Sequence, residues 1–256
     1  MIVCFALAAC LHAPTFAGAW AGFGRPLSRP PVSLVASPAH VSLTGAAREA
    51  VTVTSAGRQP VVVEVARAGY GLDLRGRPRV GRLRAPWISV RPRRARIVPG
   101  GKAMFVVASS PPSRAEPGDH SELVLLVARP LRTAALSVRM RLGVIVVVRV
   151  RGRIVRRLTP IRLRARTRGR ARQLDLLLRN AGNVTEAVDT GCLTLGLRRP
   201  AARLVHLRPV ARTLLPHTRG IAEFRYPKRW HGRATVSIER RRRCPGLLLR
   251  RFVLRL

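Results

Sequence analysis

The chain has 256 residues, 47% of them hydrophobic, and this supply of apolar side chains excludes a globally disordered protein. It has 49 lysines and arginines against 11 aspartates and glutamates, which gives a formal net charge of +38. Such a charge attracts polyanions, including nucleic acid, anionic lipid and acidic wall polymers, without selecting among them. Lys102 and Lys228 are the only lysines. This arginine bias is as consistent with a GC-rich genome as with selection for guanidinium chemistry.

The first 24 residues carry no charged side chain and contain small residues near their end, which predicts a secretory signal peptide or an N-terminal anchor over residues 1–24. Pro14 and Gly18 interrupt the apolar run and disfavour a stable membrane span. A signal peptide normally begins with a basic region, and none precedes this apolar run. A start codon assigned too late in the reading frame would explain its absence. The segment Leu7–Cys10 also resembles a lipobox, which would make Cys10 a lipidated anchor. We therefore expect a secreted or cell-envelope bacterial protein, either soluble or tethered at its N-terminus.

Cysteine usage points to the same compartment. Removal of a signal peptide takes away Cys4 and Cys10 and leaves Cys192 and Cys244. In an oxidising compartment the simplest prediction is one disulfide between these two residues. Metal binding by two cysteines so far apart in the sequence is the weaker alternative.

A proline- and serine-rich stretch over residues 25–38 predicts a linker, and short apolar segments follow it. They are rich in valine, isoleucine and threonine, and glycine or proline separates nearly all of them, which predicts an immunoglobulin-like β-sandwich over residues 39–151. The segments are VSL, AVTVTSAG, PVVVEVARAGYG, PWISVRP, AMFVVASSPP, ELVLLVARP and LSVRMRLGVIVVVRV.

Arginine alternates with apolar residues within Ser137–Leu142 and again within Ile161–Arg166. In a strand this alternation places the apolar side chains on one face and the arginines on the other. Most of the arginines are therefore predicted to coat outward strand faces, where they also oppose edge-to-edge aggregation. The candidates for binding an anionic polymer are Arg139, Arg141, Arg162, Arg164 and Arg166.

A second set of short strands follows residue 152 and predicts a second immunoglobulin-like sandwich over residues 152–256. The expected fold class is all-β, with two tandem sandwiches and a boundary between residues 148 and 160. The predicted strands are Leu174–Leu178, Cys192–Leu195, Arg203–Leu207, Ile221–Phe224, Ala234–Ile238 and Leu247–Leu256.

Motifs for catalysis or cofactor binding are absent from the sequence, which has no glycine-rich phosphate loop, His-Glu-x-x-His or Cys-x-x-Cys. Asp119, His120 and Ser121 are the residue types of a hydrolase triad, but consecutive residues of an extended segment point to opposite faces. Glu116, Asp119, His120 and Glu122 could gather around a metal, although a solvated acidic loop is the favoured interpretation. We therefore predict no enzyme, no cofactor and no metal.

Aromatic residues amount to only 4% of the chain, which gives little support for base stacking on single-stranded nucleic acid. The segment Tyr226–His231 is the one place where aromatic and basic residues mix. It could contact a sugar or a protein, but a turn with Trp230 tucked onto the sandwich is favoured.

Several short motifs resemble bacterial surface immunoglobulin-like domains. Trp87-Ile88, Val98–Gly101 and Glu116–His120 are similar to the peptidoglycan-binding domain of the WxL-interacting protein family, which is also similar to the first domain of periplasmic pilus chaperones. Asn180–Asn183 and Leu215–Arg219 resemble the second, partner-facing domain of the same family. The resemblance spans about residues 31–256, but its motifs are mostly turns. Members of that family typically end in a transmembrane helix and a basic tail, whereas this chain ends at Leu256.

These observations predict a non-enzymatic, exported envelope protein that binds an anionic wall polymer or another surface protein. The first alternative is a periplasmic pilus-type chaperone that completes a partner's sheet with its edge strand. The second alternative is a basic nucleic-acid-binding protein, which the charge alone would allow. Membrane contact is expected only through the N-terminal segment, and the oligomeric state stays open.

Overall fold

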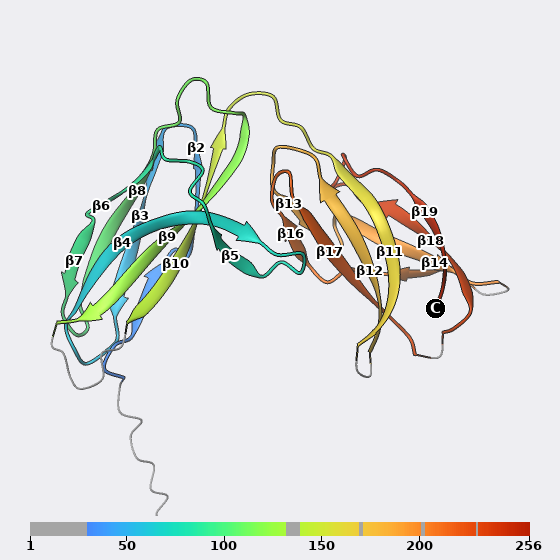
Figure 1. Ribbon diagram of the computed structural model, residues 1–256, viewed down its shortest axis with the longest axis horizontal. Coiled ribbons are helices and arrows are strands. Elements are labelled where there is room, and N and C mark those ends of the chain that lie inside the picture. Colours follow the sequence, from blue (N-terminus) through green and yellow to red (C-terminus); the bar gives the residue numbers. More distant parts are fainter. Residues whose placement is uncertain (1–29, 132–138, 169–170, 201–202, 229) are drawn as a thin grey trace, which may run out of the picture.

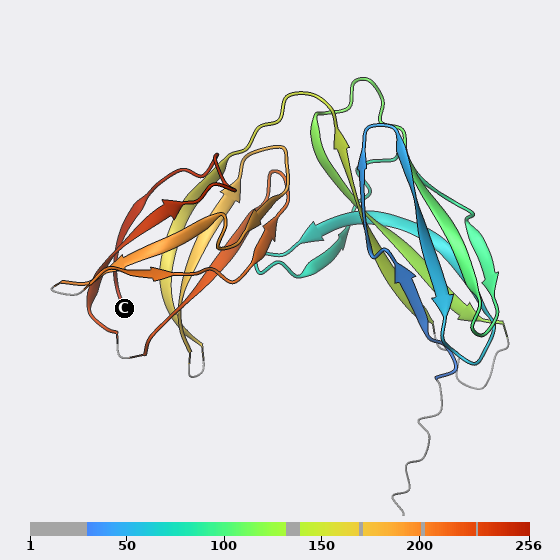
Figure 2. The same ribbon diagram turned by 180° about the vertical axis from the view of Figure 1, so that it is seen from behind.

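The computed structural model describes residues 30–131, 139–168, 171–200, 203–228 and 230–256 (Figure 1). In this part of the chain every regular element is a strand, which confirms the all-β prediction. Figures 1 and 2 show the strands arranged as two sandwiches, one built from the first half of the chain and one from the second. The predicted signal peptide or anchor over residues 1–24, with Cys10, lies outside the described residues. No helix that could span a membrane occurs among the described residues.

The first sandwich consists of two sheets. One has the strand order β1-β3-β8-β6, and the other has the order β2-β10-β9-β4-β5, with β7 also paired to β4. The strands of the first sheet are β1 (Leu34–Ser37), β3 (Ala47–Ser55), β8 (Lys102–Ser109) and β6 (Ile88–Arg91). Those of the second are β2 (His40–Thr44), β10 (Met140–Val150), β9 (Gly118–Pro130), β4 (Val61–Leu72), β5 (Pro78–Gly81) and β7 (Arg94–Ile97).

Alternation along β10 shows how the sequence builds this core. Val144, Val146 and Val148 are fully buried between the sheets, whereas Arg141 is exposed on the opposite face. Phe105 of β8 is the bulkiest fully buried residue of the same cluster. The period-two pattern therefore places apolar side chains inside and arginine outside, as predicted.

The consecutive strands β1 and β2 belong to different sheets. β1 pairs antiparallel with β3, and after the cis Ser37–Pro38 peptide β2 pairs parallel with β10. β1 lies inside the segment 25–38 that the sequence predicts to be a linker. Val32 and Leu34 are buried and alternate with more accessible neighbours, as in a strand. The alternation is too short to be recognised in a sequence segment that is rich in proline.

The second sandwich begins with β11 at Leu158, after β10 has ended at Val150. Its sheets have the orders β11-β12-β17, β13-β16 and β15-β14-β18-β19. The first contains β11 (Leu158–Arg168), β12 (Ala171–Asn180) and β17 (Arg219–Tyr226). The others contain β13 (Glu186–Val188), β16 (Arg212–Leu214), β15 (Val205–Leu207), β14 (Leu193–Arg198), β18 (Arg233–Arg240) and β19 (Arg251–Arg255).

The core of the second sandwich contains the predicted disulfide. Cys192 and Cys244 are buried and bonded, with their Cα atoms 4.7 Å apart, so the predicted pairing is confirmed. Trp230 belongs to the same buried cluster, and the Arg199 guanidinium lies 5.0 Å from the centroid of its ring. Trp230 is therefore tucked onto the sandwich rather than presented to a sugar or a protein partner.

Candidate functional site

Strand β10 has one edge that is only partly covered. Strand β9 pairs with it along its whole length, from Met140 to Val150. On its other edge, β2 pairs only with the stretch from Ile145 to Arg149. Among the residues that the structure describes, no strand pairs with this second edge between Met140 and Val144. The first half of β10 therefore presents an open sheet edge.

Hydrogen bonds to the neighbouring β2 segment show which backbone groups face the open edge. The Ile145 N–H donates to the Ala39 carbonyl at 3.0 Å, and the Arg149 carbonyl accepts from the Gly45 N–H at 2.8 Å. Backbone directions alternate along a strand, so odd-numbered residues of β10 point to this side. Arg141 and Gly143 therefore each present a donor and an acceptor to the open edge. Unpaired groups of this kind are a template for another strand.

Side chains beside this edge differ between the two faces of β10. Met140 and Leu142 are partly buried and pack against the first core. On the other face Arg141 and Gly143 are exposed, and a Cβ added at Gly143 would lie 3.0 Å from Cδ1 of Leu123. Gly143 has no side chain that could shield the backbone at the open edge. The Leu123 side chain lies next to Gly143 on the outer face of the sheet. A strand that paired with this edge could place its own apolar side chains next to Met140 and Leu142 and so extend the apolar inner face of the sheet.

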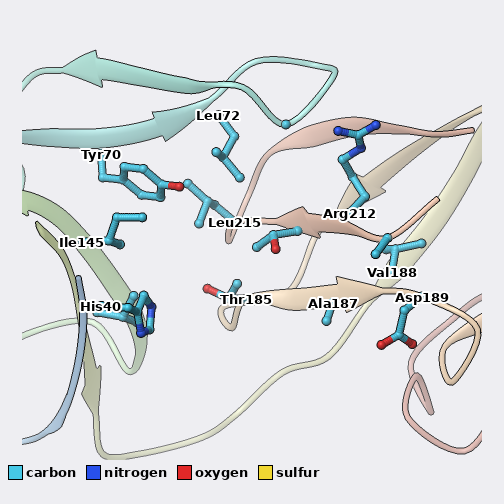
Figure 3. A pocket seen from close by; sticks show the side chains of 14 residues that line it. His40, Tyr70, Leu72, Ile145, Thr185, Ala187, Val188, Asp189, Arg212 and Leu215 are labelled. Atoms are coloured by element: carbon cyan, nitrogen blue, oxygen red, sulfur yellow. The ribbon is translucent and has the colours of Figure 1, made fainter. Parts of the chain in front are cut away.

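A cleft between the sandwiches adjoins the outer face of β10. It contains a partly open cavity of about 400 Å³, lined by Tyr70, Leu72 and Ile145 of the first sandwich and by Arg212 and Leu215 of the second (Figure 3). The guanidinium of Arg212 is engaged, because it lies 3.8 Å from a carboxylate oxygen of Glu223. The rest of the lining is mixed, because His40, Thr185 and Asp189 line the cavity beside the apolar residues.

Asp119 holds the two sandwiches together at one side of this cleft. Its carboxylate accepts two hydrogen bonds from Arg149, at 2.7 and 2.9 Å, and one from the Thr185 N–H at 2.8 Å. Burial alone would raise the pKa of Asp119, but the bonds from Arg149 and Thr185 leave it below the ordinary value. Asp119 is therefore a structural ionic contact and makes no bond to His120 or Ser121 in the described structure.

Asn183 completes this junction from the second sandwich. Its side-chain amide donates to the carbonyls of Pro117 and Arg153, both at 2.8 Å, and its Oδ1 accepts from the Val155 N–H at 2.7 Å. The Asn183 carbonyl accepts from the Asp119 N–H at 2.8 Å. Two turn motifs of the sequence, Glu116–His120 and Asn180–Asn183, thus meet and fasten the sandwiches to each other. Their separate positions in the sequence give no sign of this contact.

The acidic residues weighed as a metal site do not converge. Glu122 is buried, and its Oε1 accepts from the Ala85 N–H at 3.1 Å. Glu116 is exposed, and His120 turns its ring edge-on to Trp87, with the centroids 5.5 Å apart. No group of three metal-ligating side chains occurs in the part of the chain that the structure describes.

The candidate polymer-binding arginines fall into two separate places. Arg162, Arg164 and Arg166 are exposed on the outward face of β11. Asp175 of β12 is the register partner of Arg164 and lies 3.4 Å from Arg166. This face is therefore not purely cationic. The other two candidates, Arg139 and Arg141, lie on the first sandwich at the open end of β10. The five residues do not form one site, and a role in binding for their side chains stays a prediction.

Comparisons with known proteins bear on the fold. No protein-family model matches the chain, and a search of curated proteins finds no relative. Among solved structures, the YadV chaperone is 11% identical and has a TM-score of 0.47, and the alignment covers 87% of this chain and 99% of that chain. The CupB2 chaperone of Pseudomonas aeruginosa is 14% identical with a TM-score of 0.43, covering 87% and 100%. The SafB chaperone of Salmonella enterica, solved with SafA pilin, is 11% identical with a TM-score of 0.44, covering 88% and 96%.

These findings correct the leading functional prediction. The similar structures described above are those of pilus chaperones. At this level of identity the likeness describes the two-sandwich fold alone. These structures match the first alternative, a pilus-type chaperone, better than the leading interpretation as a wall-polymer-binding protein, which is therefore corrected and not carried forward. Function must be argued from the open edge and the cleft.

Proposed function

We propose that the protein is a periplasmic, non-enzymatic chaperone that holds exported partner proteins by strand addition at the open edge of β10. The observation that carries this proposal is the unpaired backbone of Arg141 and Gly143, which lies on the same strand as Ile145 of the cleft lining. SafB is solved in complex with a pilin. We extend this class of partner, an exported subunit, to the present chain as part of the proposal.

Strand addition divides affinity and specificity between backbone and side chains. The backbone groups of Arg141 and Gly143 supply up to four hydrogen bonds, each worth about 1 kcal/mol net. Met140 and Leu142 would lie under the added strand and make apolar contact with its inward side chains. A partner whose own sheet lacks a strand is stabilised most by this pairing, because β10 then also satisfies the unpaired backbone groups of the partner's sheet.

Two features of the sequence support export. The first 24 residues are uncharged and have the composition of a signal peptide. The disulfide between Cys192 and Cys244 is the kind of bond that persists in the periplasm.

Replacement of Arg141 by proline tests the proposal. Arg141→Pro removes an N–H that points to the open edge, so it should leave the β9 ladder intact and abolish partner binding. The matched control is Val253→Pro in β19. The backbone bonds that flank the β18–β19 ladder are made by Arg250 and Leu256, so even-numbered residues face β18 and the Val253 N–H also points away from its partner strand. Each variant is co-expressed with the organism's exported subunits whose sandwiches lack a strand.

The proposal expects at least one subunit to form a stable complex with the wild type and with Val253→Pro, but not with Arg141→Pro. Complexes that form equally well with Arg141→Pro would contradict it, as would the failure of every subunit to bind the wild type. Circular dichroism of the free variants verifies that both are folded.

A further inference from the structure

A two-stranded ribbon leaves the first sandwich and reaches the second. The last residues of β4, Gly69–Leu72, pair with β5, while β9 pairs with β4 only as far as Gly69. All four residues of β5 are exposed. Figures 1 and 2 show this ribbon extending toward β16 and β17. A lone ribbon is at best marginally stable in water, so its tip requires support from elsewhere.

The turn at the tip is fixed by its own hydrogen bonds. The Asp73 carboxylate accepts from the N–H groups of Arg75 and Arg77, at 2.8 and 2.9 Å. The backbone bond to Arg77 is the main cause that lowers the pKa of Asp73. Gly76 has φ of 76°, a conformation that glycine adopts without strain. The turn therefore presents Arg75 in a defined direction.

The tip docks on the second sandwich through backbone and side chain together. The Leu74 carbonyl accepts from the Ile221 N–H of β17 at 2.7 Å. Arg75 donates to Oε1 of Glu223 at 2.6 Å, and its guanidinium lies 3.9 Å from Oδ2 of Asp175. The tip thus contacts the edge of β17 opposite β12, where the Val210 N–H also donates to the Glu223 carbonyl.

The docking site needs a cation from outside its own strand pair. Asp175 and Glu223 are directly opposite in the β12–β17 register, and their side chains are only 6% and 15% exposed. Like charges facing each other across strands are destabilising. Arg166 lies 3.4 Å from Asp175 and Arg212 lies 3.8 Å from Glu223, both within the second sandwich. Arg75 adds a third cation from the first sandwich and makes the shortest of these contacts, 2.6 Å to Glu223. Arg212 also donates to the Arg75 carbonyl. A Cβ at Gly76 would lie 2.7 Å from Cδ of Arg212, so the side chain of Arg212 would have to shift to accommodate it.

We infer that this ribbon is a strap, held by Arg75, that fixes the angle between the two sandwiches and closes one side of the cleft. Tyr70, Leu72 and Gly76 of the strap line the cavity, so its release would open the space beside β10. The connection over residues 151–157 and the contacts of Asp119 and Asn183 join the sandwiches elsewhere, so the strap is a second attachment between them. The inference concerns the free chain and stands whether or not β10 binds a partner.

Arg75→Ala is compared with Arg77→Ala in the full chain. Arg77 lies in the same turn and is exposed, and its side chain contacts neither Glu223 nor Asp175 in the described structure. One measurement is hydrogen exchange at the Ile221 amide. The other is the distance between spin labels on cysteines introduced at Ser89 and Arg242, which are exposed residues of the first and second sandwich. Cys4 and Cys10 are replaced by serine in every sample.

For Arg75→Ala we expect exchange at Ile221 to be at least tenfold faster and the distribution of label distances to be wider, while core amides of both sandwiches keep their protection. Arg77→Ala should match the wild type in all three respects. Wild-type values for Arg75→Ala would overturn the inference. Equally accelerated exchange in both cores would also overturn it, because Arg75 would then act on overall stability rather than as the anchor of a strap.

Discussion

Loss of the disulfide between Cys192 and Cys244 is expected to lower the free energy of unfolding of the second sandwich by about 4 kcal/mol. The two residues are 52 positions apart, and closing a loop of that length removes roughly this much entropy from the unfolded chain. The bond also ties the loop before β14 to the segment after β18, two parts of one core. Urea unfolding of Cys192→Ala/Cys244→Ala, followed through the buried Trp230 with Trp20 and Trp87 replaced by phenylalanine, measures the effect.

The reduced but otherwise unchanged protein is the control, because it loses the cross-link without losing side-chain volume. Both samples should show the same direction of change, and the exchange protection of the first sandwich should be unaffected. A loss smaller than about 1 kcal/mol in both samples would show that the cross-link adds little to the packing of this core.

Replacement of Glu122 by glutamine is expected to stabilise the first sandwich by about 3 kcal/mol at pH 8 and by very little at pH 4. Glu122 is fully buried, and its Oε2 has no hydrogen-bond partner among the described residues. Burial raises the pKa of Glu122 from 4.5 to about 7, although the nearby Arg67 opposes the rise. A shift of this size corresponds to about 3 kcal/mol at 1.36 kcal/mol per pH unit.

The sign follows from proton binding. The folded protein holds the Glu122 proton more tightly than the unfolded chain, so this group favours folding below pH 4.5. That contribution is lost as the pH rises through about 7. Glutamine keeps an acceptor for the Ala85 N–H without the charge. Thermal melts from pH 4 to pH 8 measure the difference, with exposed Glu116→Gln as the control. An equal gain at both pH values would contradict the account, because the gain would then not come from ionisation.

Period-two alternation was sufficient to predict long strands such as β10 and β11 and their inward faces, but not short strands such as β1. It places Val144, Val146 and Val148 in the core and arginines such as Arg164 outside, and both are found. Such alternation is local, so one strand is enough to reveal it. The disulfide could also be predicted, because the expected mature chain offers only one pair of cysteines.

Pairings between distant segments could not be predicted in this way. The parallel contact of β2 with β10 leaves half of β10 uncovered, and neither segment alone shows where pairing stops. Arg75 resembles the other exposed arginines in the sequence, yet it reaches two carboxylates on the other sandwich. Arg141 was expected to act through its side chain, whereas in the structure its backbone N–H and carbonyl face the open edge of β10.

Hydrogen exchange along β10 tests the central claim most directly, and its first part needs no partner. In the free chain, the amides of Arg141 and Gly143 should exchange at least tenfold faster than those of Leu142 and Val144, which face β9. When a bound subunit adds a strand, Arg141 and Gly143 should become protected while Val253 in β19 stays unchanged. Protection of Arg141 and Gly143 equal to that of Leu142 in the free chain, or no change in the complex, would contradict the proposed edge.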